Sequence, residues 1–189
     1  MKKALTLIIF MISISLNAQD APDFRTLNWK MTQQQVKAKE KGLVLQESTN
    51  DELVYSGTVL NKDAFIFYDF IDNQLSSAYF GFTINNVSKN KYVEDFNIIK
   101  EKLIAKYGQP NEDITEWREN LYKDDPDNIG MAIACEHVVY RTVWYQDKTA
   151  INLLMTGKEF KISISLYYQS VDLIKEKIEN DKNKIKDEI

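Results

Sequence analysis

Two stretches of this chain alternate strictly between apolar and polar side chains, and this alternation limits its fold more than any other feature. In residues 160–168, one face of an extended chain would carry Phe160, Ile162, Ile164, Leu166 and Tyr168, and the other would carry Lys161, Ser163, Ser165 and Tyr167. Within residues 75–84, the two faces would carry Ala78, Phe80, Phe82 and Ile84, and Ser77, Tyr79, Gly81 and Thr83. Such strands bury one face and leave the other in water, which is typical of an antiparallel sheet.

Six further segments have the composition of strands, and turn residues separate most of them. They are residues 43–47, 53–60, 64–71, 113–117, 138–145 and 149–156. Most of the connections are short, which favours antiparallel pairing between consecutive strands. The strand at 64–71 also has apolar residues on its second face, because Phe65 and Phe67 alternate with its core positions. That second face is therefore either covered or binds something.

Two helices are expected ahead of the two groups of strands. Thr32 and Gln35 have the spacing of a capping box for a helix at residues 32–41, which Gly42 can end. In residues 91–107, apolar side chains recur at steps of four and three, and Gly108 and Pro110 follow. The order predicts an α+β protein with two α-then-β units, about 24–86 and 87–169, whose helices pack on one face of antiparallel sheet. The expected core contains Val36, Ile66, Phe80, Phe82, Phe96, Ile99, Leu103, Trp144, Ile151, Leu153, Ile162 and Ile164.

Residues 170–189 have a different composition, with a thin apolar seam in a charged segment. Val171, Ile174, Ile178 and Ile185 lie at helical spacing, so we expect a solvated C-terminal helix. It would either dock on its own domain or form a short coiled coil with a partner.

The first residues predict export. Lys2 and Lys3 precede an apolar run from Ala4 to Leu16, with Ala18 at the expected cleavage position, so residues 1–18 fit a secretory signal peptide. The run is shorter than the roughly 20 residues that span a bilayer, which makes an uncleaved anchor the weaker alternative. No cysteine lies near the cut to accept a lipid. We expect a periplasmic or extracellular protein without a transmembrane anchor after cleavage.

Charge and cysteine content exclude several classes of protein. Without Lys2 and Lys3, 22 basic residues stand against 28 acidic ones, and the net charge falls from −4 to −6. With only Arg25, Arg118 and Arg141 as arginines, a nucleic-acid partner is not expected. Cys135 is the single cysteine, so no intramolecular disulfide can form.

A short motif carries a family resemblance. The run from Trp29 to Val36 (Trp-Lys-Met-Thr-Gln-Gln-Gln-Val) resembles the opening of the small lipoprotein of the outer-membrane barrel-assembly machinery, whose relatives include the β-lactamase inhibitor protein. Gly108-Gln109-Pro110 followed by Trp117 is similar to a second motif of that group. The resemblance implies tandem α-plus-antiparallel-sheet units and an exported module that binds proteins and has no chemistry of its own.

Catalytic motifs are scarce. His137 is the only histidine, and the sequence has no recognisable nucleophile–base pair, phosphate-binding loop or histidine cluster. Cys135 and His137 would share a face of the expected strand, yet two ligands do not make a zinc site. We therefore expect a non-catalytic protein without a cofactor. An exported hydrolase that uses a pair of carboxylates stays as the alternative.

An acidic loop suggests a second alternative, calcium binding. Asp125, Asp127, Gly130 and Glu136 match positions 1, 3, 6 and 12 of a helix-loop-helix calcium loop. Ile129 fails at position 5, where an oxygen ligand belongs. The other interpretation is an acidic surface loop with ordinary turn residues.

The polar face of the sheet is the candidate binding surface. It would carry Tyr79, Asn152, Ser163, Ser165 and Tyr167. Tyrosine, serine and asparagine are typical of adaptable protein-binding surfaces, and the expected partner is another exported or envelope protein. The alternatives are an ordinary solvated sheet face, or a face that the C-terminal helix folds back to cover.

Overall fold

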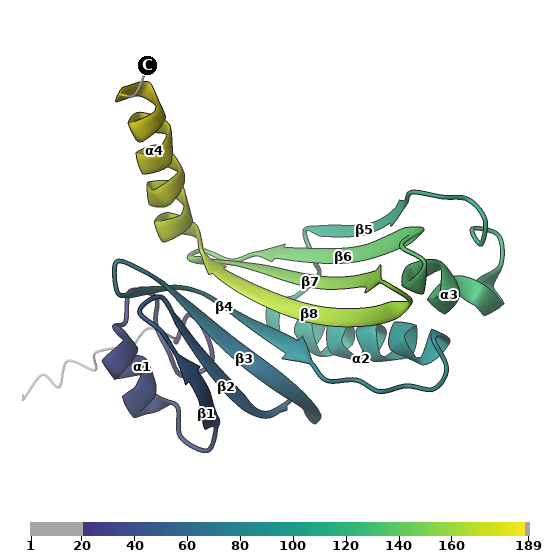
Figure 1. The fold of residues 1–189 in the computed structure, drawn as a ribbon, viewed down its shortest axis with the longest axis horizontal. Helices are drawn as coiled ribbons and strands as arrows, with labels where there is room; N and C mark the ends of the chain where they lie inside the picture. Colours follow the sequence, from purple (N-terminus) through teal and green to yellow (C-terminus); the bar gives the residue numbers. More distant parts are fainter. Residues whose placement is uncertain (1–20, 188–189) are drawn as a thin grey trace, which may run out of the picture.

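The predicted strands form one antiparallel sheet of eight strands, in the order β1-β2-β3-β4-β8-β7-β6-β5. The computed structural model describes residues 21–187, so the predicted signal peptide at residues 1–18 lies outside the described residues. The α+β prediction is confirmed, with two α-then-β units whose strands meet where β4 pairs with β8 in the middle of the sheet (Figure 1).

The predicted helices and strands occur in the predicted order, and the second unit contains two further short helices. The first unit contains α1 (Gln33–Lys39), β1 (Val44–Ser48), β2 (Glu52–Val59), β3 (Lys62–Ile71) and β4 (Gln74–Phe82). The second contains α2 (Asn90–Tyr107), β5 (Glu112–Trp117), η1 (Pro126–Asn128), α3 (Ile129–Ala134), β6 (Val138–Tyr145), β7 (Thr149–Lys158) and β8 (Lys161–Ser170). The C-terminal helix is α4 (Val171–Asp187).

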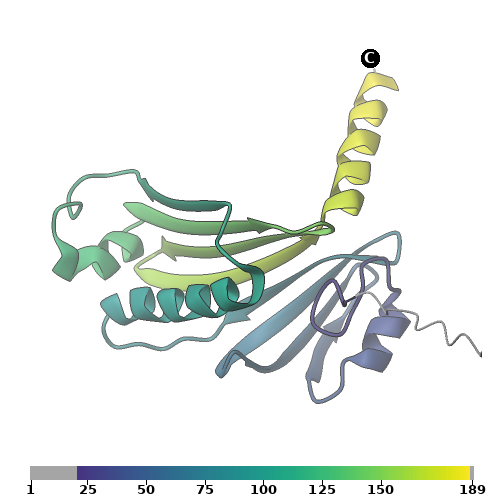
Figure 2. The same ribbon diagram turned by 180° about the vertical axis from the view of Figure 1, so that it is seen from behind.

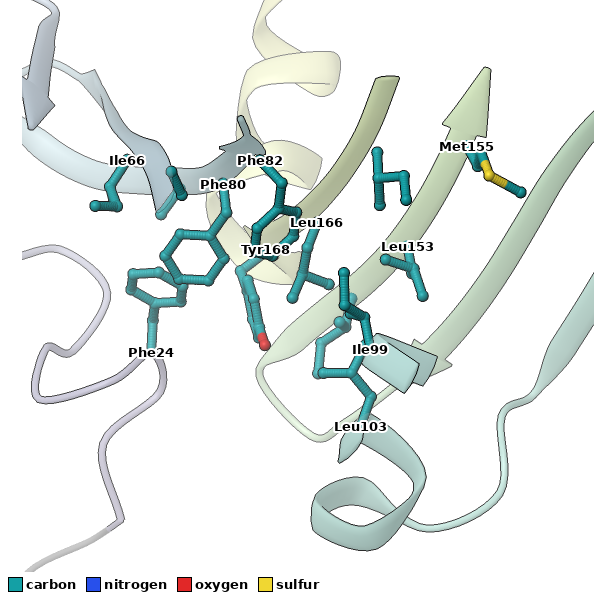
Figure 3. Close-up of a cluster of buried hydrophobic side chains, with 14 of the residues drawn as sticks. Phe24, Ile66, Phe80, Phe82, Ile99, Leu103, Leu153, Met155, Leu166 and Tyr168 are labelled. Atoms are coloured by element: carbon teal, nitrogen blue, oxygen red, sulfur yellow. The ribbon is translucent and has the colours of Figure 1, made fainter. Parts of the chain in front are cut away.

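The two predicted helices, α1 and α2, pack on one face of the sheet. α1 lies beside the β1–β4 half, and α2 runs along the half that contains β7 and β8 (Figure 2). All twelve predicted core residues are buried. Figure 3 shows Ile99 and Leu103 of α2 turned toward Leu153, Leu166 and Tyr168 of the sheet. Burial of these apolar side chains is the main favourable contribution to folding.

Phe24 joins the two halves of the core. Its ring lies 5.4 Å from that of Phe80 and 4.7 Å from that of Tyr168, which belong to the neighbouring strands β4 and β8 (Figure 3). Because β4 and β8 come from different units, this contact makes the two halves share one hydrophobic cluster.

The predicted capping box begins α1. The backbone N–H of Thr32 donates to Oε1 of Gln35 at 2.9 Å, and the backbone N–H of Gln35 donates to Oγ1 of Thr32 at 3.4 Å. The helix ends earlier than predicted, at Lys39, with Glu40 as its C-cap. The Glu40 side chain is buried, where it accepts a hydrogen bond from Tyr68 and pairs with Arg25 at 3.3 Å. These two partners satisfy the buried Glu40 carboxylate, which thereby holds the end of α1 against the sheet.

The helix α3 was not predicted. It lies between the predicted strands at 113–117 and 138–145 and packs on Gly157 of β7, where a Cβ atom would stand 1.8 Å from the carbonyl oxygen of Ile133. The expected strand at Cys135 and His137 is therefore wrong. Cys135 is the C-cap of α3, Glu136 has a positive φ of 65°, and β6 begins only at Val138.

The C-terminal helix α4 continues directly from β8 and projects away from the sheet (Figures 1 and 2). Its first turn docks through the buried Leu173, and Glu176 pairs with Lys30 at 3.7 Å. Ile178, two turns along, is 48% exposed. The described part of the tail therefore does not cover the polar sheet face. Over residues 21–187, the structure contains no helix long and apolar enough to cross a membrane.

Candidate functional site

The sheet face turned away from α1 and α2, here called the open face, carries a row of stacked aromatic rings. Phe67 of β3, Tyr79 of β4 and Tyr167 of β8 lie directly opposite one another in the register of three neighbouring strands. The rings of Phe67 and Tyr79 are 4.2 Å apart and inclined by 4°. Those of Tyr79 and Tyr167 are 5.2 Å apart and inclined by 26°. We call these three residues the aromatic row.

The strand register creates this row across the junction of the two units. Antiparallel neighbours that lie directly opposite bring their Cβ atoms close together, so planar side chains at such positions stack. Phe65 extends the apolar surface, with its ring 6.4 Å from that of Phe67 and 45% of the residue exposed. The second face of β3 is therefore not covered, although β3 lies inside the sheet between β2 and β4.

Three of the five predicted binding residues belong together. Tyr79, Tyr167 and Asn152 occupy consecutive positions across β4, β8 and β7. In the described part of the chain, the buried Oδ1 atom of Asn152 has no hydrogen-bond partner. On the β7 side, the aromatic row therefore ends beside a buried amide oxygen that accepts no hydrogen bond from the described residues.

The two predicted serines lie further along β8 on the same face. Ser165 stands opposite Gly81 of β4 and Leu154 of β7. Ser163 stands opposite Thr156, and the two hydroxyl groups are hydrogen-bonded at 3.3 Å. Ser163 is thus engaged within the sheet, and the aromatic row rather than the serines forms the most distinctive part of the surface.

Two acidic residues border the row, and no sequence motif predicted them. Asp69 of β3 lies opposite Glu52 of β2, two positions along from Phe67 on the same face. The Ser77 hydroxyl donates to Oδ2 of Asp69 at 2.6 Å. We call Glu52 and Asp69 the acidic pair. Only the pairing of β2 with β3 brings these residues together, which is why spacing along the chain gave no signal.

The electrostatics of the row follow from this neighbourhood. Burial raises the pKa of Glu52, and the nearby carboxylates of Asp69 and Glu47 raise it further. Burial raises the pKa of Tyr79 to about 12, with contributions from Asp69, Glu52 and Tyr167. A negative charge on the Tyr79 phenol is thus strongly disfavoured at neutral pH, and the surface presents neutral rings beside carboxylates.

The calcium candidate does not form a ligand set. Asp125 caps η1, where its carboxylate accepts from the backbone N–H of Asp127 at 3.2 Å and from the Asn128 side chain at 2.8 Å. Residues 126–134 are helical instead of forming the open loop that a calcium site needs. Within the described residues, no three His, Cys, Asp or Glu side chains lie close enough to hold a metal ion, so Asp125, Asp127 and Glu136 are not brought together.

The side chain of His137 lies beside an aromatic residue. Its ring stacks on that of Tyr122 at 5.8 Å, and its buried Nδ1 atom lacks a hydrogen-bond partner among the described residues.

The hydrolase alternative needs two carboxylates in a cavity. Two carboxylates, those of Asp23 and Asp172, line a cavity with a volume of about 310 Å³. Lys30 and Lys148 line the same cavity. The carboxylate of Asp23 accepts the backbone N–H of Trp29 at 3.0 Å, so it helps to fix the N-terminal segment.

Comparison of the chain with protein-family models, with curated proteins and with solved structures found no match in any of the three.

Proposed function

We propose that this protein is an exported, non-catalytic module that binds another exported or envelope protein on the open face of its sheet. The observation that carries the proposal is the aromatic row, which lies on a face that no helix of the described chain covers. A contiguous apolar patch with a polar border is typical of an interaction site.

The composition of the face supports protein binding over a purely structural role. Tyrosine rings bury a large area at low cost in conformational entropy, and each also offers a hydroxyl group. Stacking between strands would by itself account for Phe67 and Tyr79, but it does not require Phe65 to stand 45% exposed beside them.

The test compares binding by the purified protein with binding by two variants. Exported and envelope proteins of the producing cell are passed over the immobilised chain, and the captured protein is purified and titrated. We expect Tyr167→Ala to weaken its binding by about tenfold or more, since central aromatic side chains dominate such interfaces. Phe160→Ala is the matched control, because Phe160 is an exposed aromatic residue in the turn between β7 and β8. Equal binding by the wild-type chain and a folded Tyr167→Ala variant would contradict the proposed site.

Export is tested separately. The mature protein is recovered from the periplasm and the medium, and its first residues are sequenced. A start at Gln19 is expected, whereas intact chains that begin at Met1 in the membrane fraction would contradict export.

A further inference from the structure

We infer that the partner places a cationic side chain, an arginine or a lysine, beside the aromatic row and against the carboxylates of the acidic pair. This inference rests on the proposed function and specifies the chemistry of the partner. The open face is a docking surface with an apolar centre, and the carboxylates beside that centre indicate the charge of the partner.

The carboxylates next to the aromatic row have no cation of their own. Among the side chains that the structure describes, neither Glu52, Asp69 nor the neighbouring Glu47 forms an ion pair. The charges nevertheless lie close enough together to affect one another, because Asp69 and Glu47 both raise the pKa of Glu52. Protein folding has thus left like charges side by side on an uncovered face, which is unfavourable in the isolated chain.

Among the described residues, the basic side chains on the same face do not pair with the acidic pair. Lys158 and Lys161 stand opposite each other at the ends of β7 and β8 that lie away from Tyr167. Arg141 of β6 lies opposite Ile114 of β5, and its guanidinium group pairs with Glu112 at 3.3 Å. It therefore does not neutralise the acidic pair on β2 and β3. The positive charge that would complement this region has to come from outside the described chain.

Both components of the surface favour a cation. Stacking covers both faces of the Tyr79 ring, so the row offers a cation its hydroxyl oxygens as acceptors and its ring edges as a surface for the apolar stem of an arginine or lysine. The acidic pair adds charge attraction, and Asp69 has the Ser77 hydroxyl as one hydrogen-bond donor. A neutral partner that covered this region would bury unpaired carboxylates, and an anionic partner would also be repelled. One arginine or lysine beside the row can pack its stem against the rings and pair its charge with the carboxylates.

The probe for the test is a library of random twelve-residue peptides displayed on phage. Selection uses the folded wild-type chain, after removal of peptides that also bind a Tyr79→Ala, Tyr167→Ala double variant. We expect the enriched peptides to share an arginine or lysine. Replacing that residue by citrulline or acetyl-lysine, which removes the charge and keeps most of the shape, should weaken binding about tenfold.

The complementary change is made on the protein. Glu52→Gln with Asp69→Asn should weaken binding of the charged peptide about tenfold and reduce its dependence on salt. The control is Glu119→Gln with Asp124→Asn, which makes the same change in net charge in the connection between β5 and η1. Binding by this control should stay within about twofold of the wild type, provided that long-range attraction is screened by salt.

The outcomes separate the inference from the proposed function. Enriched peptides that lack a cation, and that bind equally to the Glu52→Gln, Asp69→Asn variant, would overturn the inference while leaving the open face as a binding site. Peptides that bind only through surfaces other than the aromatic row would overturn the proposed function and the inference together.

Discussion

The hydroxyl group of Tyr68 donates a hydrogen bond of 2.5 Å to Oε1 of Glu40, and this contact joins the middle of β3 to the end of α1. Glu40 is 7% exposed and also pairs with Arg25. Burial raises the pKa of the Tyr68 phenol well above its ordinary value, and the negative charge of Glu40 and the hydrogen bond to it raise it further. The phenol therefore stays protonated and remains a donor.

Removing this donor should destabilise the fold. In Tyr68→Phe, the Glu40 carboxylate loses a hydrogen bond inside the protein, and we expect a loss of about 1.5–3 kcal/mol in the free energy of unfolding, measured in urea. Tyr92→Phe is the matched control, because the Tyr92 hydroxyl donates to a neutral acceptor, the carbonyl oxygen of Ile84, at 2.9 Å. A loss no larger in Tyr68→Phe than in Tyr92→Phe would contradict a special role for the charged acceptor.

Two neighbouring positions of α2 should differ sharply in their contribution to stability. Phe96 is buried, with its ring 5.9 Å from that of Tyr140, so Phe96→Ala should cost about 3–5 kcal/mol of unfolding free energy. Ile98 lies on the outer side of the helix and is 46% exposed, so Ile98→Ala should change stability by only about 0.5 kcal/mol. A cost below about 1 kcal/mol for Phe96→Ala would remove Phe96 from the core.

Two glycines in strands should respond in opposite directions to a methyl group. In Gly157→Ala, the added Cβ atom would meet the backbone of α3, and the resulting displacement should cost about 1–3 kcal/mol. At Gly81 on the open face, the nearest atom is Cε2 of Phe67 at an ordinary 3.7 Å. Gly81→Ala should therefore stabilise the chain by about 0.5 kcal/mol, because it restricts the unfolded state. Thermal unfolding of both variants measures the difference, and a stabilised Gly157→Ala would show that α3 does not pack there.

The open face should have a distinct alkaline titration. The difference in phenolate absorbance between the wild-type chain and Tyr79→Phe should show a pKa of about 12. Because the folded pKa lies above the unfolded value of about 10, this contribution to stability is fully present below pH 10 and is lost as the pH rises through 12. In Asp69→Asn, the Tyr79 pKa should fall while staying above its ordinary value, since burial is the larger cause. An unchanged Tyr79 pKa in that variant would contradict the closeness of Asp69.

The sequence by itself determined the strands, the helices α1, α2 and α4, and the faces of the strands. Hydrophobic alternation, strand-forming composition and turn residues are local properties, so together they were sufficient to predict the eight strands, and alternation assigned Phe80 and Ile164 to the core. Helix α3 escaped prediction because its segment, residues 129–134, is short and apolar on most sides, and gives no amphipathic period.

Only the tertiary structure decided which residues of the open face are neighbours. Alternation assigned Tyr79 and Tyr167 to the same face, but their distance depends on the pairing of β4 with β8, and the two residues are 88 positions apart in the chain. The same holds for Glu52 and Asp69, which meet through the register of β2 and β3. A side chain's face follows from a period of two residues along its own strand, whereas its neighbours follow from the register between strands, which the burial of the whole core fixes.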